Sequence, residues 1–467
     1  MWFALPPPNK HKGEPMVRSR GLVVLSLVAF VAFACGGSTP TTTNKGTIKI
    51  GVSLPLSGAS ASDGQPTLKG AEFAVNQQNA KGGIDGFQLQ VVSKDYAPAG
   101  TPDPAVGKND MLALVGDTSV LAVMGPFNSG VALQQLPVAN QASLVMVSPS
   151  NTNPCLTVDL AACHFPQIGF WPSQLRPYGA NNYFRVAATD VFQGGAAADY
   201  AYTTLGLRTV GVFNDETSYG IGIAEYFAEH FCKLGGTVVG GCTATAAGGV
   251  SGIKQYDPTS TASFAAMLNS LKAGGAQGLY AGGNASLKLC VARNQSNGIF
   301  PAGSAFLMGD GGVDSECIDG AAAQAKGMVG TVAAEDQSKL SADAKKMVSD
   351  FKAAMGSGPT DFGAYTVPAY AATQTIIAAL DKAIKANGGN LPTRQQVRDA
   401  MSSLPPVSTP LGDVSFDKNG DTTQQIIAFY KADAKGSSSS ELTCGATNAN
   451  VCWEFANSKN YAGQTYP

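Results

Sequence analysis

Histidine is scarce in this chain, and the sequence patterns of common enzymes are missing. Only three histidines occur among the 467 residues, namely His11, His164 and His230. The patterns G-x-S-x-G, H-E-x-x-H and Walker A do not occur. Serine hydrolases of the α/β type, zinc proteases and P-loop NTPases each place their reacting groups through one of these patterns. We therefore expect no enzyme activity and no cofactor.

Charged residues are also few. Asp, Glu, Lys and Arg make up 14% of the chain, the net charge is −2 and the pI is near 6.0. Proteins that bind nucleic acids or anionic membrane surfaces usually carry a basic excess, which this chain lacks. We expect neither kind of partner.

The apolar run near the N-terminus, residues 21–33, is shorter than the roughly 20 residues that a membrane-spanning helix needs. It follows the basic residues Arg18 and Arg20 and precedes Ala34 and Cys35. This order of basic, apolar and small residues before a cysteine is typical of a bacterial lipoprotein signal. Cleavage before Cys35 would leave an acylated cysteine that anchors the protein to the cell envelope membrane, outside the cytoplasm. The alternative is a buried apolar segment with a core cysteine.

The signal divides the first 46 residues into three segments. Residues 1–15 fit no signal region and are interpreted as a non-native extension, with Met16 as the true start. Residues 16–34 form the expected signal peptide. Residues 35–46 contain almost nothing to bury and are interpreted as a lipidated tether.

The remaining eight cysteines indicate an oxidising compartment. They fall into close sequence neighbours, although eight cysteines allow 105 connectivities. No pair has Cys-x-x-Cys spacing, and only His164 lies near a cysteine pair, so a zinc site is less favoured than disulfides. The expected local disulfides are Cys155-Cys163, Cys232-Cys242, Cys290-Cys317 and Cys444-Cys452.

Short β-branched runs alternate with helical patterns from residue 47 onward, which predicts an α/β fold with parallel sheets. About 400 residues are more than one hydrophobic core usually serves, so two lobes are expected. The first unit has expected strands at 48–52, 89–92, 120–124 and 144–147 and helices at 65–80, 106–115 and 131–140.

The alternation restarts after residues 155–182, which are rich in Pro, Gly, Trp and Tyr and are interpreted as a surface insertion. The second unit has expected helices at 195–205, 221–234, 263–272 and 286–294 and strands at 209–213, 237–239, 278–281 and 305–308. A later part could complete the first unit, with a strand at 328–333 and helices near 342–355, 370–385 and 394–403.

Five short segments then carry a family resemblance. They are TIKIGVSLPLSG at 47–58, NAKGGIDG at 79–86, VSPSNTNP at 147–154, SYG at 218–220 and FDKNGD at 416–421. In kind and order they resemble the periplasmic binding proteins of the branched-chain amino acid type, the type I solute-binding proteins of ABC transporters. The resemblance covers roughly 47–433.

The resemblance implies two doubly wound parallel-sheet lobes joined by a multi-strand hinge. We expect lobe 1 to comprise residues 47–187 and 332–413, and lobe 2 to comprise 188–331 and 414–435. Residues 436–467 lie outside the resemblance and form a C-terminal tail with its own disulfide, for which the sequence indicates no function. The protein is expected to be a monomer.

The resemblance also implies a ligand site between the lobes. Loops at the carboxyl ends of parallel strands expose backbone N–H groups that can hold a carboxylate. Matching positions assign this role to Ser129, Ser150 and Thr152, which are alternatively helix caps and turn residues. Asp190 matches an acid that binds the ligand ammonium, or it only caps the helix that follows. Tyr219 matches a tyrosine that closes over the ligand, or it simply packs.

Three positions depart from the family pattern and indicate a more polar ligand than leucine. Asp63 stands where an aromatic residue is common, and Asn284 follows two glycines where a second tyrosine is common. The family's second acid aligns with Gly311, and Asp310, one residue earlier, could replace it. The acidic stretch from 310 to 319 fails the EF-hand spacing, so no metal is expected there.

The sequence thus predicts a lipoprotein that binds a small amphipathic solute, an amino acid or a related carboxylate or amide, and delivers it to an ABC transporter permease. Two alternatives stay open. The same fold serves ligand-sensing partners of membrane receptors. An envelope hydrolase would need a nucleophile and a base that converge in the cleft.

Overall fold

The computed structural model of the protein describes residues 44–245, 248–259, 261 and 263–464. The expected extension, the signal peptide and Cys35 lie outside the described residues. Within the part that is described, no helix has both the length and the apolar character needed to cross a membrane.

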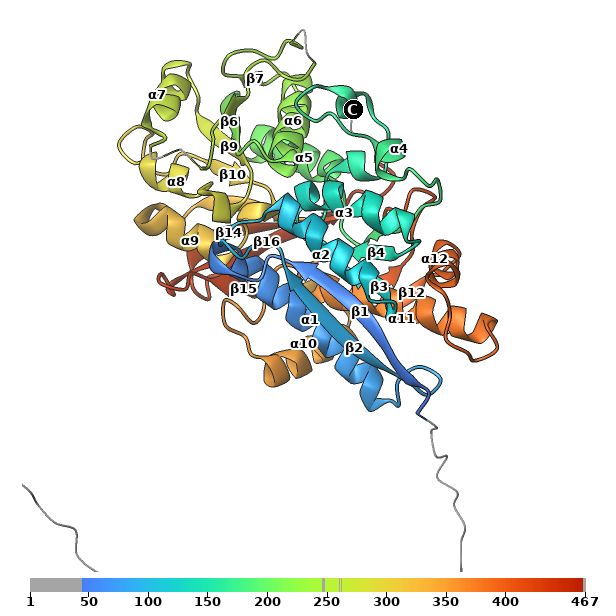
Figure 1. The fold of residues 1–467 in the computed structure, drawn as a ribbon. Helices are drawn as coiled ribbons and strands as arrows, with labels where there is room; N and C mark the ends of the chain where they lie inside the picture. Colours follow the sequence, from blue (N-terminus) through green and yellow to red (C-terminus); the bar gives the residue numbers. More distant parts are fainter. Residues whose placement is uncertain (1–43, 246–247, 260, 262, 465–467) are drawn as a thin grey trace, which may run out of the picture. The chain divides into compact units, whose positions relative to one another are not determined.

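Five parallel strands form the first sheet, in the order β2-β1-β3-β4-β5 (Figure 1). Strand β3 is buried along its whole length, and its residues are divided between two apolar clusters, Val123 in one and Ala122 in the other. Such two-sided burial explains its continuous apolar sequence. The strands are β1 Gly46–Leu54, β2 Phe87–Asp95, β3 Val120–Met124, β4 Val145–Ser148 and β5 Tyr183–Arg185.

Six helices pack around this sheet. Helix α1 packs on α11, and α2 packs on α3. Gly70 allows the close approach of α1 and α11, because a Cβ atom there would lie 2.3 Å from the carbonyl oxygen of Thr366. The helices are α1 Ala61–Ala80, α2 Pro104–Gly116, α3 Ser129–Gln141, α10 Ala342–Met355, α11 Thr366–Ala386 and α12 Arg394–Ser402. We call this sheet and its helices the first lobe.

The second sheet has the order β15-β16-β14-β11-β10-β9-β6-β7, with β8 paired to β6. The neighbouring strands β7, β6, β9, β10 and β11 are parallel to one another. Strands β14, β15 and β16 pair antiparallel with their neighbours. The strands are β6 Thr209–Asn214, β7 Thr237–Val238, β8 Lys254–Gln255, β9 Gly278–Gly282, β10 Phe306–Met308, β11 Met328–Val332, β14 Ile426–Ala434, β15 Glu441–Cys444 and β16 Val451–Asn460.

Helices α5 and α6 pack on each other and on this sheet. The helices of this part are α5 Asp190–Asp199, α6 Ser218–Lys233, α7 Ala265–Ala273, α8 Val291–Gln295 and α9 Ser315–Ala321. We call them, with the second sheet, the second lobe. The predicted fold class, α/β with two largely parallel sheets, is confirmed.

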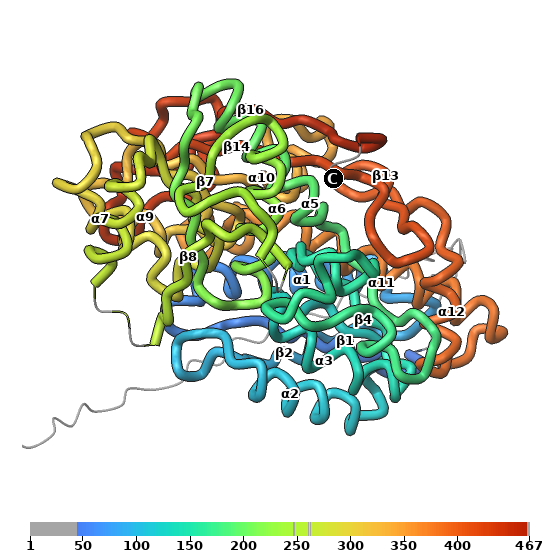
Figure 2. The backbone as a smooth tube through the Cα atoms, turned by 90° about the horizontal axis from the view of Figure 1, so that it is seen from above, coloured from blue at the N-terminus to red at the C-terminus, as the bar shows by residue number. Residues whose placement is uncertain are grey.

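Two features differ from the sequence expectation. Strand β11 pairs with β10 and β14, so the strand expected at 328–333 belongs to the second sheet rather than to the first unit. The C-terminal tail continues the second sheet as β15 and β16, and Figure 2 shows β14 and β16 in red on the side of the molecule away from the blue strands. Trp453 of β16 is fully buried and donates from Nε1 to the carbonyl oxygen of Asp314 over 2.9 Å.

Three chain segments connect the lobes. The first leads from β5 to α5, the second from β11 to α10, and the third follows the hairpin of β12 Val407–Thr409 and β13 Gly412–Val414 and leads to β14. Backbone bonds join them, since Ala188 N donates to Ala333 O over 3.4 Å and Arg185 N to Gly420 O over 3.0 Å. These segments form the multi-strand hinge.

All four expected cysteine pairs are disulfides in the structure. Their Cα–Cα distances are 5.5 Å for Cys155–Cys163, 5.8 Å for Cys232–Cys242, 5.1 Å for Cys290–Cys317 and 3.9 Å for Cys444–Cys452. The insertion after β4, residues 154–176, contains the short helix α4 Pro172–Leu175 and is closed by the first of these disulfides.

Candidate ligand-binding site

Polar side chains are buried in two loops at the carboxyl ends of β3 and β4. Ser129 begins α3, while Ser150 and Thr152 follow β4. All three are at most 3% exposed. Because parallel strands place their carboxyl ends at one edge of a sheet, the two loops lie together.

These loops are held by their own hydrogen bonds. The Ser150 hydroxyl donates to the carbonyl oxygen of Phe127 over 3.0 Å. The Tyr96 hydroxyl accepts from the backbone N–H groups of Phe127 and Asn128 and donates to the Asn128 side chain over 3.0 Å. Ser150 and these two N–H groups are therefore already paired. Tyr96, which orders the loop, was not among the predicted site residues.

Asp190 is fully buried at the start of α5 and is the most unusual group of the site. Neither of its carboxylate oxygens has a hydrogen-bond partner among the described residues, and the same is true of the Thr152 hydroxyl. The backbone N–H of Asp190 donates to the carbonyl oxygen of Thr152 over 2.8 Å, so the two residues are neighbours. The Asp190 side chain makes no capping bond to α5. The capping alternative therefore does not explain its carboxylate.

Burial raises the pKa of Asp190 well above its ordinary value, and repulsion from Asp310 adds to this shift. The nearby Thr152 hydroxyl, although outside hydrogen-bond geometry, and Arg185 lower it in part. Arg185 is already paired to Asp421 at 2.7 Å. Asp190 therefore lacks a cation of its own.

Asp310 lies directly after β10 and faces two tyrosines from different lobes. Tyr219 of α6 donates to Asp310 Oδ1 over 2.8 Å, and Tyr365, which precedes α11, donates to Oδ2. The Tyr219 hydroxyl also accepts from the N–H of Gly311 over 3.1 Å. Burial raises the pKa of Asp310, and the tyrosine hydroxyls lower it in part. Tyr365 was missed by the sequence reasoning, because no motif or period marks it.

Asn284 forms a second contact between the lobes. Its side-chain oxygen accepts from Asn128 Nδ2 over 3.2 Å, and its Nδ2 donates to Asp215 over 3.0 Å. Beside this contact lies a pocket of about 380 Å³, which Ser129, Tyr219 and Asn284 help to line. The structure thus brings one predicted residue of the first lobe together with two of the second.

Asp63 lies at another part of the interface. It lines a narrow space together with Asp314 and Tyr365. The neighbouring Ser62 hydroxyl donates to Asp314 Oδ2 over 2.9 Å across the lobes. Burial of the Asp63 carboxyl raises its pKa well above the ordinary value, and the charges of Asp314 and Asp310 add to the shift. Asp63 and Asp190 do not line one common pocket.

The acids of this interface lack cationic partners. None of the ion pairs found within the described residues involves Asp63, Asp190, Asp310 or Asp314. Such a region favours a positively charged group. In the described ranges the one cluster of metal-type side chains is Glu441 with Cys444 and Cys452, whose sulfurs form a disulfide.

Comparison with known proteins agrees with this geometry. The family described as "Periplasmic binding protein" matches residues 47–437. A relative named Leu/Ile/Val-binding protein homolog 2, from Brucella abortus (strain 2308), is 30% identical over 385 residues, which are 82% of this chain and 90% of that protein. The chain belongs to the periplasmic binding protein family. Its members are extracytoplasmic solute-binding proteins and not enzymes.

Solved structures share the fold. The leucine-binding protein LivK of Thermotoga maritima MSB8 has a TM-score of 0.68 at 23% identity, covering 88% of this chain and 99% of that one. A solute-binding protein of R. palustris in complex with 4-hydroxybenzoate has a TM-score of 0.67 at 18% identity, covering 90% and 98%. At these identities the two structures show the fold alone.

Proposed function

We propose that the protein is a solute-binding lipoprotein that closes on an amino acid, or a related small amphipathic carboxylate or amide, and delivers it to the permease of an ABC importer. The observation that carries this proposal is the Asp190 carboxylate, which is fully buried and has no hydrogen-bond partner among the described residues. A buried ionised carboxylate is costly unless it is paired. The α-ammonium of a ligand would supply the missing partner.

The neighbours of Asp190 suit an ammonium. Thr152 offers a second unpartnered oxygen beside it, and Asp310 adds negative charge. An ammonium has three donors and no acceptor, so several oxygens can share it. In a buried site these charge-assisted hydrogen bonds are stronger than in water. We therefore assign Thr152, Asp190 and Asp310 to the ammonium end.

The carboxylate end belongs to the first turn of α3. This helix spans Ser129–Gln141, and Ser129 lines the 380 Å³ pocket at its N-terminus. Helix N-termini favour anions through free N–H groups and the helix dipole. Tyr219 and Asn284 would contact the same ligand from the second lobe, Ser150 would order the loop, and Asp63 would favour a polar ligand substituent. The printed names of two relatives, a Leu/Ile/Val-binding protein homolog and an amino acid binding protein of Pseudomonas aeruginosa, agree with this ligand class.

Closure is proposed as a hinge motion at the three connections. Contacts between the lobes, such as Asn153 Nδ2 to Ser218 O at 2.8 Å, would open and re-form. A ligand that touches both lobes binds only the closed form fully and shifts the population toward it. We propose the lobe boundaries 47–187 with 332–413 and 188–331 with 414–435, and an envelope anchor through a lipid on Cys35.

Ligand-dependent stabilisation tests the proposal. The purified protein is screened by thermal unfolding against leucine, isoleucine, valine, a polar amino acid series and 4-hydroxybenzoate. A ligand at 100 times its Kd stabilises by about 2.7 kcal/mol. We expect a shift with an amino acid that Asp190→Asn abolishes. The matched control Asp413→Asn removes an exposed carboxylate of β13 and should leave the shift unchanged.

Other outcomes contradict parts of the proposal. Stabilisation by carboxylates that lack an amine, and by no amino acid, would exclude the ammonium site while keeping the solute-binding role. If no solute stabilises the protein, delivery to an importer is contradicted and the sensing alternative returns.

A further inference from the structure

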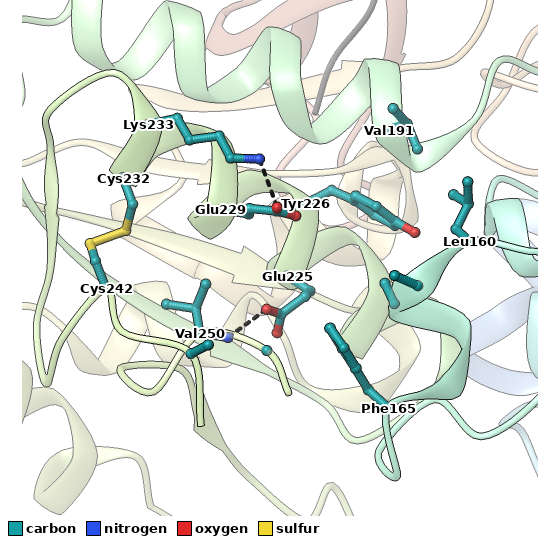
Figure 3. A pocket seen from close by; sticks show the side chains of 14 residues that line it. Leu160, Phe165, Val191, Glu225, Tyr226, Glu229, Cys232, Lys233, Cys242 and Val250 are labelled. Atoms are coloured by element: carbon teal, nitrogen blue, oxygen red, sulfur yellow. Dashed lines mark hydrogen bonds and ion pairs between the residues drawn. A yellow bond between two sulfur atoms is a disulfide. The ribbon is translucent and has the colours of Figure 1, made fainter. Parts of the chain in front are cut away.

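A second, larger cavity lies against α6, and Val191, which follows Asp190 in the chain, is among the residues that line it. Its volume is about 640 Å³, within the range of 300 to 1,000 Å³ that is common for small-molecule sites. Figure 3 shows its walls, with Leu160 and Phe165 from the insertion after β4 on one side and Glu225 and Tyr226 of α6 on the other. Val250, from the loop between β7 and β8, closes a third side. We call this cavity the α6 pocket.

Two disulfides fix the walls of the α6 pocket. Cys155–Cys163 closes the insertion that carries Leu160, and Cys232–Cys242 ties the end of α6 to the loop between β7 and β8. The insertion also bonds to that loop, because Gln167 Nε2 donates to the carbonyl oxygen of Gly248 over 3.3 Å. A cavity with cross-linked walls is largely formed before a ligand arrives, which lowers the entropic cost of binding.

Two polar groups of α6 lie in this apolar surrounding, and one of them is unpaired within the part of the chain that the structure describes. Tyr226 is 5% exposed, and its hydroxyl has no hydrogen-bond partner among the described residues. Glu225 is also 5% exposed, and its Oε1 accepts from the N–H of Val250 over 2.5 Å. In Figure 3 the Tyr226 ring crosses the pocket toward Leu160, and the second oxygen of Glu225 points away from Val250. Buried polar groups are normally paired, so the Tyr226 hydroxyl indicates a missing partner.

The charged side chains that line the α6 pocket indicate whether its ligand carries a positive or a negative charge. Glu225 and Glu229 lie one turn apart on α6 and both line the cavity. Lys233, the one cation of the lining, is paired with Glu229 at 2.7 Å. Glu225 is therefore the charge that remains without a cation. Phe165 offers an aromatic face, which also favours a cation.

We propose that the α6 pocket binds a small hydrophobic amine. The ammonium of this amine binds the Glu225 carboxylate and donates a second hydrogen bond to the Tyr226 hydroxyl. The apolar part of the amine packs on Leu160, Phe165 and Val250. This site is separate from the proposed amino-acid site, because its acid, its walls and its volume are all different.

Isothermal titration of the purified protein with phenethylamine tests the proposal. Phenylacetate, which has a similar body and the opposite charge, is the ligand control. The measurement is made at pH 8, because burial raises the pKa of Glu225 to about 7 and its carboxylate must be ionised. We expect phenethylamine to bind and phenylacetate not to bind. Glu225→Gln keeps an oxygen for Val250 and should weaken phenethylamine binding about tenfold or more.

Two further variants separate this site from the amino-acid site. Tyr226→Phe removes one oxygen atom and should weaken phenethylamine binding about threefold or more, since one hydrogen bond is lost. Asp190→Asn should weaken phenethylamine binding far less than Glu225→Gln does, because Asp190 acts on Tyr226 only through its charge, and it should abolish the amino-acid shift. The Leu160 and Val250 methyl NMR signals should move when phenethylamine is added.

The proposal is overturned if phenethylamine does not bind, or if its binding is lost in Asp190→Asn but kept in Glu225→Gln. It is also overturned if the Leu160 and Val250 methyl signals stay in place at saturating phenethylamine. Should Glu225→Gln fail to fold, Tyr226→Phe and the methyl signals of the unaltered protein decide.

Discussion

Arg185 and Asp421 form a buried ion pair at the hinge, with 2.7 Å between Arg185 Nε and Asp421 Oδ1. The Arg185 guanidinium also donates to the carbonyl oxygen of Asn153 over 2.7 Å and to the Thr157 hydroxyl over 2.5 Å. Asp421 Oδ2 accepts from Thr157 over 3.0 Å. The pair thus joins the first and third connections between the lobes to the base of the insertion.

Removal of one partner should destabilise the protein strongly. Asp421→Ala leaves the Arg185 charge buried without compensation, and we expect the free energy of unfolding to fall by about 3 to 5 kcal/mol. Urea denaturation measures this change. Asp350→Ala is the control, because Asp350 pairs with Lys346 on an exposed helix face and such pairs contribute at most about 1 kcal/mol. Equal effects of the two variants would contradict the structural role of the hinge pair.

Ligand affinity should rise with pH. The Asp190 pKa is raised in the folded protein, so at low pH the carboxyl is protonated and cannot pair with an ammonium. Pairing lowers this pKa, so amino-acid binding releases a proton and tightens as the pH rises above the ordinary pKa of an aspartate. Titration calorimetry in buffers of different ionisation enthalpy measures the released proton. An affinity that stays flat as the pH rises would contradict the role of Asp190.

The unliganded protein should become less stable between about pH 4 and 7. Burial raises the pKa of Asp314 to about 7, of Glu225 to about 7 and of Asp110 to about 6. In this window the folded state holds protons that the unfolded state has released, so the free energy of unfolding falls as pH rises. Urea denaturation at pH 4.5 and pH 7 tests this direction, and a higher stability at pH 7 would contradict it.

The bond from Tyr365 to Asp310 should favour the closed form. Tyr365→Phe removes one of the two tyrosine hydroxyls on this acid, and we expect a wider separation of the lobes in unliganded protein by small-angle X-ray scattering. Hydrogen bonds to charged groups contribute about 1.5 to 3 kcal/mol, enough to shift such a population. Tyr256→Phe is the control, because that hydroxyl donates to Leu287 within the second lobe. A scattering change in the control alone would contradict the assignment.

Trp453 should be essential to the second sheet. Its side chain is fully buried in β16, and Trp453→Ala should lower the free energy of unfolding by about 3 to 5 kcal/mol. Tyr178→Ala is the control, because Tyr178 is 62% exposed and exposed substitutions usually change stability by at most about 0.5 kcal/mol. If Trp453→Ala is as mild as the control, the tail does not contribute to the core.

The alternation of strands and helices was predictable because local burial dictates it. Residues 120–124 were expected as a strand and form β3, since apolar residues face helices on both sides. The antiparallel strands β14 and β16 were not expected. Their pairing joins Ile426–Ala434 to Val451–Asn460, and local sequence does not encode which segments pair.

The candidate site was predictable only where one residue carries an unusual property. Asp190 was predicted through a matching motif, and the structure shows that this residue is fully buried. Tyr365 and Tyr96 were missed because each acts through a contact with a distant segment. The contact of Asn128 with Asn284 spans 156 residues and depends on how the lobes meet.

The order of the strands in the second sheet has a consequence for biosynthesis. Strand β11 ends at Val332, whereas its neighbour β14 begins at Ile426. The ribosome therefore makes nearly a hundred intervening residues, which pack on the other lobe, before the exposed edge of β11 can be paired. A chain released early, by a stop codon or a protease, would present that open edge to other chains, and unpaired edges promote aggregation. The protein is therefore expected to be soluble only when the chain extends through β14.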